Sequence, residues 1–344
     1  MGDLFFWRNS ILRNLFLQNN QQQWIIGKTP RKIKPLGNTS PYAWVIEPTY
    51  GCNLSCGHCS HALNKKKKFL FMDKQTWINT WTLLDRFSPT VRVDLALSGE
   101  PTLHPDLVEF LSIARSISPH SQIQITTNGT MLLQKKVSYK KMLDAGANII
   151  YTDMYGPHQK FIQLASVSGY PFYEYYGINK PLDAPSPWTY HGPDLKLIVL
   201  QEQPENWPKS RFKAGLLGTW YNNLDWGKAK QFGLSPIVQP PNRRCNQPFI
   251  YVPVNYKGDY LLCCQDNCHE SENLFGNVHD GEEGFLKYWY GKKLQSFRKN
   301  LRLKNRAGNE FCRRCGITFS RCDYLHWAED EIAKTYIGNG KWKR

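Results

Sequence analysis

The chain has 344 residues, enough for one large domain or two ordinary ones, and 41% of them are hydrophobic. Charged residues at 21% and aromatic residues at 14% exclude a mainly disordered chain. The 44 lysines and arginines exceed the 28 acidic residues by 16. This excess predicts an anionic partner, such as an acidic peptide, a phosphate-rich polymer or a membrane surface, without choosing among them.

The sequence carries no signal for export or for insertion into a membrane. No stretch reaches the roughly 18 apolar residues of a membrane span, and polar or charged residues interrupt the apolar part of residues 1–20. We therefore expect a cytoplasmic protein whose ten cysteines are metal ligands or free thiols rather than disulfides. For the N-terminal extension, residues 1–41, two roles are open: covering the core or binding a partner helix.

Short β-rich segments alternate with amphipathic segments through most of the chain. Six strands are predicted, at residues 42–50, 91–99, 121–129, 147–156, 194–200 and 234–239. Helices between them are indicated by Asp73 as an N-cap, by Pro105 in a first turn and by Gly146 after a helix end. This order predicts an α/β fold, a partial (β/α)6 TIM-like barrel whose functional residues follow the carboxyl ends of the strands.

Three cysteines follow the first predicted strand with the spacing C-x3-C-x2-C: Cys52, Cys56 and Cys59. A closed structural zinc site usually needs four protein ligands. A cluster of four irons can instead be held by three thiolates, which leaves one iron open to a small molecule. Three cysteines therefore favour an open iron-sulfur cluster over a zinc-stabilised loop.

This spacing resembles the signature of the radical S-adenosylmethionine (radical SAM) enzymes, whose open iron is chelated by the amino and carboxylate groups of the cosubstrate. "LSGEPTLHPDL" after the second strand is similar to the family's Gly-Gly-Glu-Pro segment, which contacts the methionine amino group. The resemblance implies that four residues bind the cosubstrate there: Ser98, Gly99, Glu100 and Pro101. Ser98 replaces the first glycine, and Gly99 still permits a close backbone approach.

Two further polar residues belong to the same resemblance. Asn128 lies in "TTNGT" at the end of the third predicted strand, and Asp153 lies in "YTDMYGP" near the end of the fourth. The family implies that both contact S-adenosylmethionine. With the three cysteines, these segments imply a 4Fe-4S cluster that binds S-adenosylmethionine.

The C-terminal hundred residues hold seven of the ten cysteines. Their order, with the connecting segment 275–298, is similar to the SPASM domain, an auxiliary-cluster domain named after maturases of peptides and sulfatases. The resemblance implies an auxiliary 4Fe-4S cluster held by Cys245, Cys263, Cys312 and Cys315. The domains expected are an extension (1–41), a radical SAM partial barrel (42–240), a small cysteine-rich SPASM-like domain (241–330) and a basic tail (331–344).

Three cysteines remain outside these sets: Cys264, Cys268 and Cys322. In a reducing compartment they are expected to be ordinary small side chains. An alternative arrangement uses Cys312, Cys315, Cys322 and His326 as a zinc site, whose spacing is chemically acceptable. The sequence leaves this alternative open.

The function implied is that of a radical SAM oxidoreductase or maturase, which cleaves S-adenosylmethionine reductively and abstracts hydrogen from a substrate. We expect a peptide or protein substrate and an electron donor such as flavodoxin or ferredoxin. One alternative is a radical enzyme that acts on a sugar, nucleotide or other small molecule. Another is a non-enzymatic metal protein that binds nucleic acid, although no nucleic-acid motif supports it.

Overall fold

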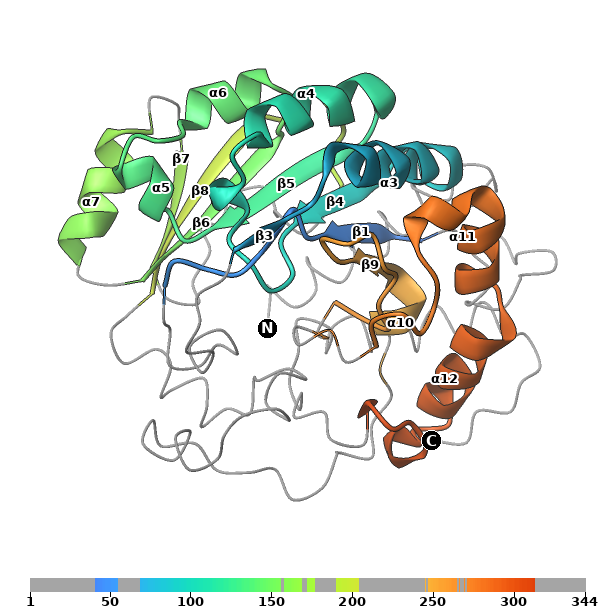
Figure 1. Ribbon diagram of the computed structural model, residues 1–344. Coiled ribbons are helices and arrows are strands. Elements are labelled where there is room, and N and C mark those ends of the chain that lie inside the picture. Colours follow the sequence, from blue (N-terminus) through green and yellow to red (C-terminus); the bar gives the residue numbers. More distant parts are fainter. Residues whose placement is uncertain are drawn as a thin grey trace, which may run out of the picture.

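The computed structural model of the protein describes residues 41–54, 69–155, 158–168, 172–176, 190–203, 245, 247–264, 266, 269 and 271–312. A seven-stranded sheet lies at its centre, with the strand order β7-β8-β6-β5-β4-β1-β9, and every neighbouring pair is parallel (Figure 1). The strands are β1 (Ala43–Ile46), β4 (Arg92–Leu95), β5 (Gln122–Thr127), β6 (Ile149–Tyr155), β7 (Phe172–Tyr176), β8 (Leu197–Gln203) and β9 (Tyr251–Val254). A small antiparallel pair joins β2 (Thr49–Tyr50) to β3 (Leu70–Phe71).

The parallel sheet confirms the predicted α/β class, and five of the predicted strands correspond to β1, β4, β5, β6 and β8. Two strands of the seven-stranded sheet were not predicted. β7 lies in the proline-rich stretch 171–193, where the aromatic segment "FYEYY" favours an extended backbone. β9 comes from the C-terminal region and pairs with β1. The predicted strand at 234–239 lies outside the described residues.

Helices cover one face of the sheet (Figure 1). Asp73 caps the first of them as predicted, because its Oδ1 accepts a hydrogen bond of 2.9 Å from the Thr76 amide. Gly146 follows the end of a helix with φ 121°, a conformation that favours glycine. The helices of this layer are α3 (Lys74–Phe87), α4 (Leu107–Ile117), α5 (Thr130–Leu133), α6 (Tyr139–Asp144) and α7 (His158–Ser166).

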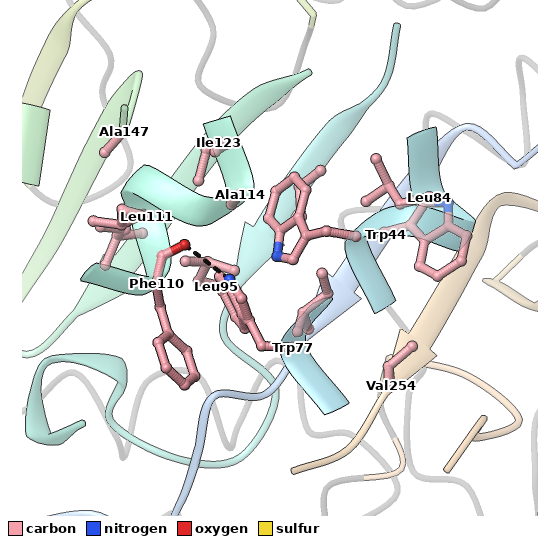
Figure 2. Packing of buried hydrophobic residues seen from close by; sticks show 14 of the residues in the cluster. Trp44, Trp77, Leu84, Leu95, Phe110, Leu111, Ala114, Ile123, Ala147 and Val254 are labelled. Atoms are coloured by element: carbon pink, nitrogen blue, oxygen red, sulfur yellow. Dashed lines mark hydrogen bonds between the residues drawn. The ribbon is translucent and has the colours of Figure 1, made fainter. Parts of the chain in front are cut away.

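The main core fills the space between the sheet and these helices. Trp77 of α3 is fully buried, and its Nε1 donates to the Phe110 carbonyl of α4 over 2.8 Å (Figure 2). Side chains alternate along each strand, and Val93 and Leu95 of β4 face this core. Arg92 and Asp94 therefore lie on the opposite face of β4, where they form a buried ion pair of 3.0 Å.

The C-terminal region packs onto the same core. Phe285 stacks on Trp44 of β1, with ring centroids 5.4 Å apart, and on Phe87 at 4.5 Å. The predicted boundary at 240 stays a prediction, because the residues around it are not described. The remaining elements are η2 (Pro101–Leu103), α10 (Gln247–Ile250), η5 (Val278–Asp280), α11 (Gly281–Trp289), α12 (Lys292–Arg302) and η6 (Arg306–Gly308). No helix among the described residues is both long and apolar enough to cross a membrane.

Candidate active site

The segment after β1 carries the first of the predicted ligands. The Cys52 Sγ accepts two hydrogen bonds of 3.4 Å, one from the Leu54 amide and one from the Asn128 side-chain Nδ2, and as a thiol it donates to Asn53 Oδ1 over 3.7 Å. Donors aimed at sulfur favour the thiolate, which is the form that ligates a metal. The surroundings of Cys52 therefore fit a cluster ligand. Cys56 and Cys59 lie outside the described residues.

Asn128 connects the loop after β5 to the cysteine loop. Its Nδ2 also donates to Asn53 Oδ1 over 2.9 Å, and its Oδ1 accepts from the Thr130 amide over 2.9 Å. Gly129, with φ 76°, begins the short helix α5 at this turn. Both ends of the Asn128 amide are thus held, and its predicted contact with the cosubstrate stays a prediction.

Glu100 joins the loops after β4 and β5 from a buried position. Its Oε1 accepts from the Thr102 amide, the Thr102 hydroxyl and the Thr127 hydroxyl over 3.1, 2.5 and 2.6 Å, and its Oε2 accepts from the Asn128 amide over 2.7 Å. Burial raises the pKa of this carboxyl, while the four donors oppose that rise. Glu100 therefore fixes the backbone of Asn128, whose side chain reaches Cys52. Pro101 begins η2 beside it.

Gly99 lies against the backbone of the cysteine loop. A Cβ atom at this position would come within 1.6 Å of the Thr49 carbonyl oxygen, and the next amide, that of Glu100, donates to the Gly51 carbonyl over 3.0 Å. Only glycine fits such an approach. Gly99 thus makes a close backbone contact with the segment that leads into Cys52, and its predicted role in cosubstrate binding stays a prediction.

Ser98 donates its backbone amide, over 3.3 Å, and its hydroxyl to one oxygen of Glu47. Glu47 follows β1 directly and is completely buried. The sequence analysis missed it, although a carboxylate at the end of a strand that leads into a cysteine motif is a recognisable signal. Asp153, the last predicted residue, lies on β6 in register with Gln201 of β8, and its role also stays a prediction.

Four C-terminal cysteines lie near one another in the described structure. The Cys263 thiol is enclosed by protein, although the residue keeps some exposed surface, and burial raises its pKa well above the usual 9.0. Neighbouring Cys264, Cys245 and Cys312 raise this pKa further. A buried thiol that resists ionisation alone is deprotonated when it ligates a metal, which supplies the missing positive charge.

These thiols are the described part of the auxiliary site expected from the sequence. Among the residues that the structure describes, no three Cys, His, Asp or Glu side chains are spaced for one metal ion. Four other C-terminal residues lie outside the described residues: Cys268, Cys315, Cys322 and His326. The fourth cluster ligand and the zinc alternative are therefore both untested.

Replacing Glu100 with glutamine is expected to loosen this site. Each carboxylate oxygen accepts at least one backbone amide, so the amide nitrogen of a glutamine must face an N–H group on one side. Losing such a charge-assisted bond costs about 1.5 to 3 kcal/mol. We expect E100Q to bind S-adenosylmethionine at least about tenfold more weakly in anaerobic calorimetry. Unchanged affinity would mean that the Asn128 turn does not depend on Glu100.

Comparisons with known proteins agree with this geometry. The family model of the radical SAM superfamily matches residues 46–177, and that of the SPASM iron-sulfur cluster-binding domain matches residues 245–316. The S-adenosyl-L-methionine-dependent 2-deoxy-scyllo-inosamine dehydrogenase of Niallia circulans is 23% identical over 271 residues, covering 78% of this chain and 90% of that relative. The PqqA peptide cyclase of Gluconobacter oxydans is 33% identical over 98 residues, only 26% of its length.

Among solved structures, BtrN in complex with AdoMet and 2-DOIA has a TM-score of 0.56 at 19% identity, covering 81% of this chain and 94% of that chain. This is a likeness of fold. The two family models cover the segments in which Cys52, Glu100 and Asn128 meet and in which Cys245, Cys263 and Cys312 gather. The chain therefore belongs to the radical SAM superfamily and is an enzyme that uses a 4Fe-4S cluster, S-adenosylmethionine and a SPASM-type auxiliary iron-sulfur site.

Proposed function

We propose that this enzyme oxidises its substrate by two electrons, beginning with removal of hydrogen from an unactivated C–H bond. When bound, the cluster and S-adenosylmethionine supply a reductive cleavage that gives methionine and a 5'-deoxyadenosyl radical. The observation that carries the proposal is the meeting of three motif segments at one point. The Asn128 side chain donates to Cys52 Sγ, and Glu100 holds the Asn128 backbone.

The residues of the first site have separate tasks in this proposal. Cys52, Cys56 and Cys59 hold the cluster by three thiolates. The backbone of residues 98–101 and the side chains of Asn128 and Asp153 bind and orient the cosubstrate. The close contact of Gly99 with Thr49 keeps the cosubstrate segment and the cysteine loop at a fixed separation.

The C-terminal cysteines supply the second centre. We assign Cys245, Cys263, Cys312 and Cys315 as its ligands. Four thiolates leave no open iron, so this centre handles electrons rather than cosubstrate. One electron enters with the reductant at the first site, and one leaves the substrate radical through the second. The substrate thus loses one hydrogen atom, one proton and one electron.

A small hydroxylated molecule is the substrate class that the comparisons favour. The match to the 2-deoxy-scyllo-inosamine dehydrogenase runs through both domains and covers 90% of that enzyme. Oxidation of a secondary alcohol to a ketone needs the electron balance given above, with the hydroxyl proton released to solvent. We infer an alcohol carbon of a polar ring or chain as the site of attack.

A peptide substrate, the class expected from the sequence, is the second candidate. The PqqA peptide cyclase supports it with 33% identity over 98 residues, and the charge excess of 16 suits an acidic peptide. That match covers about a quarter of the cyclase, so it reflects a shared segment rather than a shared whole. Because the chain is an enzyme, we set aside the non-enzymatic nucleic-acid-binding alternative.

Electrons for the first site are proposed to come from a small redox protein such as flavodoxin or ferredoxin. The charge excess of 16 favours an acidic donor. A reducing compartment such as the cytoplasm would keep the ten cysteines reduced, as thiols that can ligate clusters.

The test is anaerobic and compares the wild type with a variant in which Cys52, Cys56 and Cys59 are all alanine. After reconstitution we expect about eight irons in the wild type and about four in the variant. With reductant and S-adenosylmethionine, only the wild type should release 5'-deoxyadenosine. A screen of deuterated polyols and of peptides then separates the substrate classes, because the true substrate transfers deuterium to that product. Zinc in place of iron, or equal behaviour of the two proteins, would overturn the proposal.

A further inference from the structure

Glu47 is a completely buried carboxylate at the carboxyl end of β1. Both of its oxygens have partners. Oε1 accepts from the Ser98 amide and hydroxyl, whereas Oε2 accepts from the Tyr256 amide over 3.3 Å and lies 3.0 Å from His269 Nε2. A buried charge is strongly unfavourable unless it is paired and hydrogen-bonded. The position of Glu47 thus depends on these three partners.

The partners come from two different parts of the enzyme. Ser98 belongs to the segment proposed to bind S-adenosylmethionine. Tyr256 lies just after β9, and His269 follows the auxiliary-site cysteines. Two backbone bonds connect His269 to that site, because its amide donates to the Asp266 carbonyl over 3.1 Å and the Asp266 amide donates to the Cys263 carbonyl over 3.0 Å. Glu47 therefore contacts both the segment of Ser98 and the loop that follows the auxiliary-site cysteines.

Aromatic contacts that do not involve Glu47 join the cysteine loop to the segments of Tyr256 and His269. The Tyr50 ring, two residues before Cys52, lies 4.8 Å from the His269 ring and 5.6 Å from the Tyr256 ring. His269 itself has φ 55°, which a non-glycine residue adopts only where its surroundings hold it. Burial lowers the pKa of His269, but the adjacent Glu47 outweighs this effect and the pKa is raised overall. The rise in pKa reflects the 3.0 Å approach of the Glu47 carboxylate.

We propose that Glu47 is a positioning residue that couples the cosubstrate segment at Ser98 to the auxiliary-site loop at His269. The inference rests on the proposed function. It assigns Ser98 a task that glycine, the family's residue at this point, lacks the hydroxyl to perform. When either partner is lost, one oxygen of the Glu47 carboxylate is no longer held in place. The carboxylate can then move, and so can the segment that is bonded to its other oxygen.

The first test is a double-mutant cycle on S-adenosylmethionine affinity, measured by anaerobic calorimetry on the reconstituted full chain without reductant. S98A removes only the hydroxyl, and H269Q removes the imidazole. Each is expected to weaken binding about tenfold, a common size of coupling between sites. Because both act through Glu47, the double variant should weaken binding by well under 100-fold. S98T, which keeps a hydroxyl, should restore most of the affinity.

His279 provides the matched control. It also comes from the C-terminal region, but its ring contacts Thr76 and Asn79 of α3 over 2.9 Å. In the double variant H279Q/S98A, the fold-loss of S-adenosylmethionine affinity should therefore equal the product of the two single-variant losses. If the fold-losses of affinity in S98A and H269Q also multiply in their double variant, the two contacts are independent and the inference is wrong.

A second readout does not depend on the H269Q variant folding well. In the variant that has alanine for Cys52, Cys56 and Cys59, only the auxiliary centre titrates. Adding S98A should change its ratio of reduced to oxidised cluster at a fixed potential by at least about threefold, within the range of coupling expected between sites. No change would overturn the inference while the proposed function stands. A wild type that does not bind S-adenosylmethionine would overturn both.

Discussion

Replacing Gly99 with alanine should weaken S-adenosylmethionine binding by at least about 100-fold while the C-terminal cysteines still take up iron. The new methyl group would lie 1.6 Å from the Thr49 carbonyl oxygen and 2.6 Å from its carbon. These are backbone atoms, so no rotamer change can relieve the overlap, and overpacking of this kind costs about 1 to 3 kcal/mol or more. The two loops must separate, which breaks the bond from the Glu100 amide to the Gly51 carbonyl.

The measurement is an iron count together with anaerobic calorimetry. G99A is expected to hold between about four and eight irons, the auxiliary four being kept, and to release no 5'-deoxyadenosine. Gly192 is a suitable control because a Cβ there would meet nothing within 4 Å, although its φ is 102°. G192A should therefore affect only backbone conformation and leave cosubstrate binding unchanged. Normal binding by G99A would show that the cysteine loop can move away without consequence.

Local sequence patterns were sufficient for the strands and motifs of the first site. β1, β4, β5 and β6 were predicted because each is a short β-rich run that ends in a loop with glycine, cysteine or asparagine. In a parallel sheet the carboxyl ends of neighbouring strands lie together. The register of β4 with β1 and with β5 then brings the loops of Glu100, Cys52 and Asn128 to one edge. The order of the motifs along the sequence was therefore enough to predict that these loops lie at one edge of the sheet.

Pairings between distant segments could not be read in this way. β9 completes the sheet beside β1, but its sequence does not say which edge it joins. The contact of Glu47 with His269 has the same origin, because it depends on where β9 and the following turn place the C-terminal loop. Neither residue has a periodic or spacing signal that names the other. Tertiary packing alone brings them together.

Neighbouring cysteines present a further problem, because sequence spacing cannot decide between Cys263 and Cys264. The structure gives them different surroundings. The Cys264 Sγ donates a hydrogen bond to Gln247 Oε1 over 2.8 Å. The Cys263 thiol is enclosed by protein, and its burial together with the nearby Cys264, Cys245 and Cys312 raises its pKa. Cys263 therefore stays the proposed ligand of the pair, as the resemblance implies.

Replacing Cys263 with alanine should accordingly remove the auxiliary centre, and C264A should leave it in place. We expect the iron content of C263A to fall from about eight to about four, with S-adenosylmethionine cleavage retained and substrate oxidation lost. Cleavage persists because Cys52 and its loop are untouched, whereas the electron from the substrate radical has no acceptor. C264A loses one hydrogen bond to Gln247 and should keep both clusters. The opposite pattern, with iron lost only from C264A, would exchange the ligand assignment of the two cysteines. Loss from neither single variant but from the double variant would mean that each sulfur can replace the other as a ligand.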